Sequence, residues 1–376
     1  MRIAVFTDFG LKQMTGVSDS LALTIGRLQA RGHDLMVVEP TGPATTQRSL
    51  DVATEQIHSI GMLGAPDMRL VLPFGDVPSV RRFRPDVIHV HSTGGVGRRG
   101  VAMARAMHRP LVGTDHTLPA HYLHYARLDY PWAARWVCRD AARFFARCDV
   151  VTAPSRAMLE ELRAFGWSGE GREISNPIDV QRFRPLPAAE CKTAFGVTGQ
   201  AVLVLGRLAK EKSIDEAFRA FAALSGGPTM LVVGDGPERG NLMRLAHELD
   251  IASRVAFTGA LQGDELVRAM NACDVKLITS RSETQSMTTL QAMACGLPVV
   301  AVRAGALPEY VRDGETGRVV EAGDISGFVH ALGEAMSDER RRHWGARGRA
   351  VAESYAPDAV ADLWEQLYAN VLKRRS

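Results

Sequence analysis

The stretch Thr279–Val300, TSRSETQSMTTLQAMACGLPVV, combines an acidic side chain with the expected start of a helix. An apolar strand at Val275–Ile278 leads into a polar loop that carries Glu283, and the following residues are typical of a helix that ends at Gly296. Gln291 lies about two helical turns after Glu283. Backbone N–H groups at a helix start beside a strand's carboxyl end favour an anion. This pattern predicts an anion site, although Glu283 also fits an acid that merely stabilises the helix dipole.

Two basic side chains and a glycine occupy similar places after other predicted strands. Arg207 and Lys212 follow the strand Ala201–Leu205 in the stretch GRLAKEKSID, where a guanidinium and an ammonium can neutralise a diphosphate. Gly16 follows the first strand, where a residue without a side chain lets a phosphate approach the backbone. Each feature has a simpler interpretation, a solvated charged loop for the basic pair and a turn for the glycine.

Gly234 and two histidines are weaker candidates. Gly234, in GDGPE, permits close approach of a base or ribose, but a tight turn alone explains a glycine there. His116, in GTDHTLPAHY, follows a strand and can bind substrate or take part in catalysis. His91, in VIHVHSTGG, has a similar position. A lone histidine is more often structural, so both alternatives stay open.

The segment His121–Phe145, HYLHYARLDYPWAARWVCRDAARFF, mixes arginine with tyrosine and tryptophan. Such a composition suits a surface that touches lipid headgroups. An amphipathic helix packed on its sheet, with ordinary arginines facing solvent, explains the same pattern.

Short apolar runs alternate with helical stretches along both halves of the chain, which predicts parallel sheets covered by helices on both faces. With 376 residues, the chain is long enough for two domains. Strands are predicted at Ile3–Phe6, Leu35–Val38, Arg69–Pro73, Val87–Val90, Pro110–Thr114, Val150–Ala153 and Glu173–Ser175, then at Ala201–Leu205, Met230–Val233, Val255–Phe257, Val275–Ile278, Val299–Val302 and Gly317–Val320. The proline-rich stretch Pro177–Pro187 is interpreted as the linker.

Composition excludes several classes of protein. The five cysteines are scattered without CxxC spacing, which disfavours a disulfide framework and a zinc site. The chain shows neither a secretory segment nor an apolar run long enough for a membrane span, so we expect a cytoplasmic protein. Residues 1–185 contain 23 Lys and Arg against 18 Asp and Glu. This modest excess fits anionic lipid, a phosphorylated substrate or a plain solvated surface, and we expect no nucleic-acid partner.

The ordered set of motifs resembles the retaining, nucleotide-sugar-dependent glycosyltransferases of the GT-B fold, in the large bacterial family (group 1, family 4) with a Glu-x7-Glu motif. The resemblance covers nearly the whole chain. It rests on TGVSDSLALTIGRLQARGHDLMVV, RPDVIHVHS, TDHTLPAHY, SNPIDVQRF, VLGRLAKEKSIDEAF, GDGPER and SRSETQSMTTLQAMACGLPVVA. It implies an α/β architecture with two doubly wound Rossmann-like domains: residues 1–180 with a helix at about 357–376 on the acceptor side, and residues 188–356 binding the nucleotide-sugar.

The resemblance also implies roles for individual residues. Four are expected to act in catalysis: His116, Glu283, Lys212 and Arg207. Those expected to hold the donor are Gly16, Arg207, Lys212, Gly234, Glu283, Thr284, Gln285, Ser286, Met287 and Gln291. The family transfers a sugar with retention at the anomeric carbon and without a metal, so no metal and no cofactor is expected. The nucleotide-sugar is then a substrate.

Gln291 departs from the family pattern, which has a second glutamate there for the ribose hydroxyls of the donor. The triplet ETQ at Glu283–Gln285 resembles the diacylglycerol glucosyltransferase branch, which favours a UDP-sugar donor and a membrane lipid acceptor, with peripheral contact to an anionic membrane. A GDP-mannose-dependent mannosyltransferase acting on a phospholipid or polysaccharide is one alternative. A nucleotide-sugar epimerase and a two-domain sugar-binding protein are others.

Overall fold

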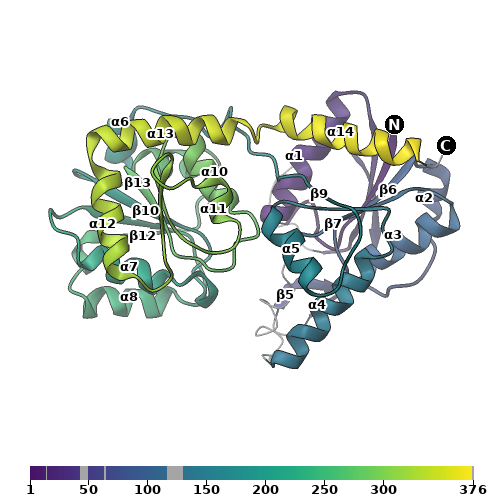
Figure 1. Ribbon diagram of the computed structural model, residues 1–376, viewed down its shortest axis with the longest axis horizontal. Coiled ribbons are helices and arrows are strands. Elements are labelled where there is room, and N and C mark those ends of the chain that lie inside the picture. Colours follow the sequence, from purple (N-terminus) through teal and green to yellow (C-terminus); the bar gives the residue numbers. More distant parts are fainter. Residues whose placement is uncertain (14, 43–49, 63–64, 117–129, 375–376) are drawn as a thin grey trace. The chain divides into compact units, whose positions relative to one another are not determined.

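The computed structural model describes residues 1–13, 15–42, 50–62, 65–116 and 130–374 (Figure 1). The chain divides into two compact units. The first unit comprises Met1–Pro177 together with Pro357–Ser376, and the second comprises Ile178–Ala356.

The first unit is built on a seven-stranded parallel sheet in the order β3-β2-β1-β6-β7-β8-β9. Its strands are β1 (Arg2–Phe6), β2 (Asp34–Pro40), β3 (Ala53–Ile57), β6 (Val87–Val90), β7 (Leu111–Thr114), β8 (Val150–Ala153) and β9 (Gly171–Glu173). The central strands β6, β7 and β8 are completely buried, which explains their unbroken apolar sequences.

Two features of this unit differ from the sequence-based expectation. The strand predicted at Arg69–Pro73 belongs instead to an antiparallel hairpin, β4 (Ile60–Met62) with β5 (Ala65–Leu70). The seventh strand of the main sheet is β3, whose sequence ATEQI is largely exposed at the edge. Because an edge strand need not be apolar, its sequence gave no strand signal.

The helices of the first unit are α1 (Gly16–Ala30), α2 (Pro78–Phe83), α3 (Gly95–Ala106), α4 (Pro131–Phe145), α5 (Arg156–Ala164) and α14 (Pro357–Lys373). Helix α14, in yellow, lies against α1, in purple (Figure 1). Arg31 at the end of α1 forms ion pairs with Asp358, Asp362 and Glu365 of α14 at 2.9, 2.5 and 2.8 Å. The last long helix of the chain is therefore part of the first unit.

The second unit contains a six-stranded parallel sheet in the order β12-β11-β10-β13-β14-β15. Its strands are β10 (Ala201–Leu205), β11 (Thr229–Val233), β12 (Val255–Gly259), β13 (Val275–Ile278), β14 (Val299–Val302) and β15 (Gly317–Val320). Its helices are α6 (Ala188–Ala194), α7 (Ile214–Ala222), α8 (Arg239–Glu248), α9 (Gly263–Asn271), α10 (Met287–Ala294), α11 (Leu307–Tyr310), α12 (Ile325–Met336) and α13 (Asp338–Glu353), with 3-10 turns η2 (Lys210–Lys212) and η3 (Ala252–Arg254).

The segment after Pro177 packs into the second unit. Ile178, Val180 and Phe183 are buried in its hydrophobic core. Arg349 of α13 donates hydrogen bonds to the backbone carbonyls of Val180 and Phe183. The second unit therefore begins at Ile178, inside the stretch whose prolines suggested a linker.

Each sheet has a point where the strand order reverses direction, and in open parallel sheets ligands bind at the carboxyl ends of the strands beside such a point. In the first unit this point lies between β1 and β6, whose ends are followed by Gly16 and His91. In the second unit it lies between β10 and β13, whose ends are followed by Lys212 and Glu283. The predicted site residues therefore gather at the edges that this fold uses for ligands.

Candidate active site

Lys212 and Glu283 form an ion pair at the reversal point of the second sheet. The Lys212 Nζ lies 2.7 Å from the Glu283 Oε1, and the Glu283 side chain is only 11% exposed. Burial by itself would raise the pKa of the Glu283 carboxyl, but the Lys212 ammonium outweighs it and holds that pKa below its ordinary value. Glu283 is therefore ionised at neutral pH, and its negative charge lies close to the start of α10.

The backbone of the Glu283 loop is held by the connection between β14 and α11. Ala306 donates its N–H to the Glu283 carbonyl at 3.0 Å, and the N–H of Ser286 donates to the Tyr310 hydroxyl at 2.9 Å. Gly305 has a φ of +52°, and a Cβ there would overlap the Glu283 carbonyl oxygen. A glycine is thus required to let the two loops approach. Sequence reasoning did not identify Gly305 or Tyr310, because nothing in a sequence shows which distant loop touches Glu283.

The loop after β10 is tied to the loop after β11 through backbone hydrogen bonds. Leu208 donates to Asp235 at 3.0 Å, and Glu238 donates to Leu208 at 2.9 Å. Gly234 has a φ of +138°, and a Cβ on it would overlap the Gly206 carbonyl oxygen. Close packing of these loops is enough to account for this glycine. Arg207 is exposed where β10 ends.

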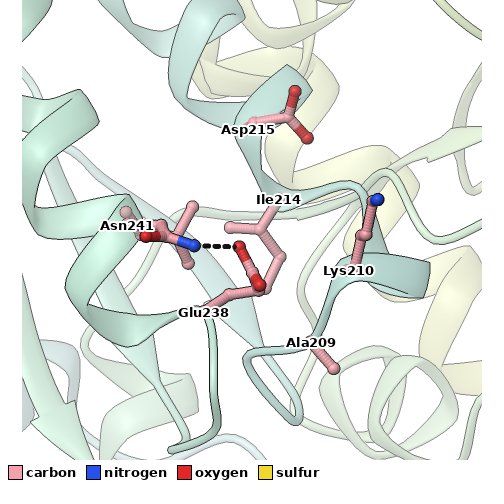
Figure 2. Close-up of a pocket in the computed structure, with 7 residues that line it drawn as sticks. Ala209, Lys210, Ile214, Asp215, Glu238 and Asn241 are labelled. Carbon is pink, nitrogen blue, oxygen red and sulfur yellow. Dashed lines mark hydrogen bonds between the residues drawn. The ribbon is translucent and has the colours of Figure 1, made fainter. Parts of the chain in front are cut away.

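A cavity of about 350 Å³ lies beside the η2 turn, between the starts of α7 and α8 (Figure 2). Asp215, Glu238 and Lys210 line it, and the Asn241 amide donates to the Glu238 carboxylate at 2.8 Å. Two carboxylates against one ammonium make this cavity a poor site for a phosphate. A diphosphate is better matched by the side of the loop that carries Lys212.

The remaining donor-site candidates lie around the start of α10. Gln285 and Ser286 are buried in the preceding loop, whereas Thr284 is half-buried. Met287 and Gln291 are both half-buried and stand one helical turn apart on the same face of α10. Their side chains share the region of Glu283 in the fold, but their roles toward a donor stay predictions.

Lys276 is a charged residue that the sequence analysis did not identify. It lies in β13 with no exposed surface, and its Nζ donates to the Thr288 hydroxyl at 2.9 Å. Burial lowers the pKa of Lys276 from 10.5 to about 7, although the Glu283 carboxylate opposes the shift. The signal was a lone lysine in the otherwise apolar strand VKLI.

Lys276→Met is expected to change how stability depends on pH. Between pH 7 and pH 10.5 the unfolded chain keeps the Lys276 proton while the folded chain loses it. Stability therefore rises with pH in this window, by up to about 1.4 kcal/mol per pH unit, and the full cost of burial applies below pH 7. Urea denaturation at several pH values across this window measures the free energy of unfolding of both proteins. The wild-type value should rise with pH relative to that of the variant. Parallel curves would contradict the buried-lysine assignment. Because both proteins contain the same cysteines, the titration of those thiols affects both stability curves equally and does not change the difference between them.

In the first unit, His116 follows β7 and Gly16 is the exposed first residue of α1. His116 is 8% exposed, and its Nε2 lies 2.9 Å from the Nδ1 of His91. Burial lowers the pKa of His116 to about 4, so its ring is neutral at physiological pH. His91, which the sequence suggested only weakly, thus contacts His116 directly. Residues 121–129 of the aromatic, arginine-rich segment lie outside the described residues.

Comparisons with known proteins agree with this architecture. Residues 14–182 match Glycosyltransferase Family 4, and residues 191–351 match Glycosyl transferases group 1. A GDP-mannose-dependent alpha-mannosyltransferase of Mycobacterium tuberculosis (strain CDC 1551 / Oshkosh) is 30% identical over 93% of this chain and 92% of its own. An alpha-monoglucosyldiacylglycerol synthase of Streptococcus pneumoniae (strain ATCC BAA-255 / R6) is 28% identical over 80% of this chain and 71% of its own.

Solved structures share the fold at low sequence identity. A sucrose-phosphate synthase from Thermosynechococcus elongatus superposes with a TM-score of 0.81 at 20% identity over the full length of both chains. Anabaena HepE in complex with UDP gives a TM-score of 0.81 at 20% identity over 98% of this chain and all of its own. The predicted GT-B fold is thereby confirmed. The chain belongs to glycosyltransferase family 4, the group 1 glycosyltransferases, and is a nucleotide-sugar-dependent hexosyltransferase of the retaining type.

Proposed function

We propose that this enzyme transfers a hexose from a UDP-sugar to a membrane lipid such as diacylglycerol. The observation that carries the donor half is the Lys212–Glu283 ion pair beside the start of α10, at the reversal point of the second sheet. A sugar diphosphate offers hydroxyl groups that suit the Glu283 carboxylate, and anionic oxygens that suit Lys212 and Arg207.

In the proposed reaction the acceptor hydroxyl oxygen bonds to the anomeric carbon, while the bond from that carbon to the diphosphate oxygen breaks. The departing phosphate oxygen takes the proton of the acceptor hydroxyl. Negative charge grows on the diphosphate, where Lys212, Arg207 and the backbone at Gly16 are assigned to stabilise it. Glu283 holds the donor hydroxyls, and the neutral His116 contacts the sugar.

The acceptor half is supported by the exposed face of α4. Trp132 and Trp136 are 67% and 63% exposed, and Arg135, Arg139 and Arg143 are exposed as well. These five side chains fall within about 100° around the helix axis at 100° per residue. Indole rings favour the interface of a bilayer, and arginines pair with lipid phosphates. None of the helices in the described ranges combines the length and hydropathy that a bilayer-spanning segment requires. We therefore propose peripheral attachment through α4, on the cytoplasmic side of the cell membrane.

Trp132→Ala combined with Trp136→Ala is expected to weaken binding to vesicles that contain phosphatidylglycerol by about a hundredfold or more, because each ring contributes ~1.5–3 kcal/mol when its apolar surface leaves water. Sedimentation with the vesicles measures the bound fraction. Met243→Ala, at another exposed apolar residue, is the control, since Met243 lies in the second unit. Equal binding by the wild-type protein and the double variant would show that α4 does not attach the enzyme to the membrane.

The nucleotide can be tested without the acceptor. A ligand at a hundred times its Kd stabilises the folded protein by about 2.7 kcal/mol, so thermal unfolding with UDP and GDP in parallel identifies the preferred base. GDP is the second candidate, because several relatives are GDP-mannose-dependent mannosyltransferases. A radiolabelled UDP-hexose incubated with a lipid extract then tests the acceptor. Label in the lipid phase supports the proposal, whereas epimerised free nucleotide-sugar or unreacted donor contradicts it.

Gln291→Glu is expected to leave transfer intact and to tighten binding of the nucleotide by about tenfold, because a carboxylate accepts a stronger hydrogen bond from a ribose hydroxyl than an amide does. Calorimetric titration with the preferred nucleotide measures the change. Loss of activity in this variant would show that Gln291 does not contact the ribose.

A further inference from the structure

A hydrogen-bonded cluster of three histidines lies behind His116. His89 lies in β6 and His91 directly follows that strand, and both side chains are buried. His91 Nδ1 is 2.9 Å from His116 Nε2, and His91 Nε2 is 3.2 Å from His89 Nδ1. His89 also contacts the hydroxyl of Tyr368 in α14, 2.8 Å from its Nδ1, and the hydroxyl of Thr114, 2.7 Å from its Nε2. Burial lowers the pKa of all three rings, so each carries a single ring proton.

The direction of these hydrogen bonds can be worked out from Thr152. Its hydroxyl lies 3.4 Å from the Gly113 carbonyl oxygen and 2.7 Å from the Thr114 hydroxyl. Both contacts are satisfied when Thr152 donates to the carbonyl and accepts from the Thr114 hydroxyl, and this is the direction that we assign. Thr114 has then used its proton, and its oxygen must accept from His89. The proton of His89 is therefore on Nε2, and its Nδ1 is an acceptor.

The same logic extends to His116. The Tyr368 hydroxyl donates to the His89 Nδ1, which leaves no proton on that nitrogen to share with His91. Two nitrogen lone pairs 3.2 Å apart would repel, and the two rings are close, with centroids 3.8 Å apart. His91 accordingly carries its proton on Nε2, and its Nδ1 accepts from the Nε2–H of His116.

We propose that this chain of hydrogen bonds holds His116 in the tautomer with its proton on Nε2, so that Nδ1 is presented as an acceptor for a substrate hydroxyl. Within the described residues the His116 Nδ1 is buried and has no hydrogen-bond partner. A buried acceptor of this kind is costly unless something donates to it. Thr114 and His91 are thus positioning residues. The inference rests on the proposed contact of His116 with the sugar.

Nitrogen NMR of histidine-labelled full-length protein tests the tautomers directly, because protonated and unprotonated ring nitrogens resonate far apart. All three rings are expected to be neutral with the proton on Nε2. A proton on the His116 Nδ1, or a charged His116 ring at neutral pH, would overturn the proposal.

Thr114→Val removes the hydroxyl oxygen that accepts from His89 and thereby sets the direction of the hydrogen bonds. The shape of the side chain at this position stays nearly the same. His89 is then expected to move its proton to Nδ1, and His91 and His116 should follow. The rate of transfer should fall about tenfold, the equivalent of one hydrogen bond. Thr114→Ser keeps the hydroxyl and should keep both the wild-type tautomers and the wild-type rate. We call this chain of hydrogen bonds from Thr114 through His89 and His91 to His116 the relay. Unchanged His116 nitrogen resonances in Thr114→Val would contradict the proposal that the relay sets the His116 tautomer.

Thr152→Val provides a second, independent break, because it frees the Thr114 hydroxyl to donate to His89. It should shift the same resonances, so an unfolded Thr114→Val variant would still leave the relay testable, and unshifted resonances in Thr152→Val would count against it. Failure of the proposed function looks different. If the wild-type tautomers are as expected but His116→Ala transfers sugar at the normal rate, the relay stands and the role of His116 in the reaction does not.

Discussion

Lys212→Ala is expected to lower the turnover number by about a hundredfold, the usual cost of removing one preorganised donor from a developing negative charge, ~3 kcal/mol. In the structure the Glu283 carboxylate already holds the Lys212 ammonium in place, 2.7 Å away. Steady-state kinetics with a labelled nucleotide-sugar measure the effect, and circular dichroism checks that the fold is retained.

Lys210→Ala is the matched control for this variant. Lys210 lies in the same 3-10 turn as Lys212, two residues away, but lines the acidic cavity and is exposed. Its removal should change the turnover number less than about twofold, as for an exposed charge. A near-normal turnover number in Lys212→Ala, or an equal decrease of the turnover number in both variants, would show that Lys212 does not stabilise the departing diphosphate.

Glu283→Gln is expected to lower kcat/KM by about tenfold to a hundredfold, because hydrogen bonds to a charged group contribute ~1.5–3 kcal/mol and glutamine keeps only the neutral part. The variant also removes the carboxylate that pairs with Lys212 and that favours the charged form of the buried Lys276. Kinetics at varied donor concentration should show the loss, and the amide preserves the shape of the side chain.

Glu238→Gln distinguishes the site at the start of α10 from the neighbouring cavity. Glu238 lines that cavity, and its carboxylate accepts a hydrogen bond from the Asn241 amide. We expect this variant to retain more than about half of the wild-type kcat/KM, as for a half-buried polar side chain that lies outside the Lys212–Glu283 ion pair. If Glu238→Gln were as damaging as Glu283→Gln, the donor would have to bind in the cavity instead.

The parallel strands could be predicted from the sequence wherever a strand is buried on both faces. The apolar runs of β10, β13 and β14 stand where periodicity placed them, and their order puts Lys212 and Glu283 at one edge. The edge strand β3 escaped prediction because its exposed residues carry no apolar pattern. The stretch at Arg69 looked like a sheet strand because local pattern does not reveal which partner a strand pairs with.

The site was predictable in its charged residues and not in what supports them. Glu283 and Lys212 lie in the loops that follow β13 and β10, so local sequence is enough to place them at the ends of those strands. The contacts of Gly305 and Tyr310 with the Glu283 loop depend on how β14 and α11 pack, which no short motif encodes. The relay behind His116 depends on Tyr368, some 250 residues further along the chain. The catalytic roles of these residues stay predictions until the variants are measured.

Helix α14 gives this enzyme an unusual order of events during synthesis. Trp364 and Tyr368 belong to the core that α1 and β1 share, yet the whole of Ile178–Ala356 must be translated before they exist. At 5–20 residues per second that delay is roughly 10–35 s. During this time the second unit leaves the ribosome with all of its strands, while the first unit still exposes the apolar surface that α14 will cover. The part of the protein made first is therefore the part that completes its folding last, and it is the part that chaperones would have to protect.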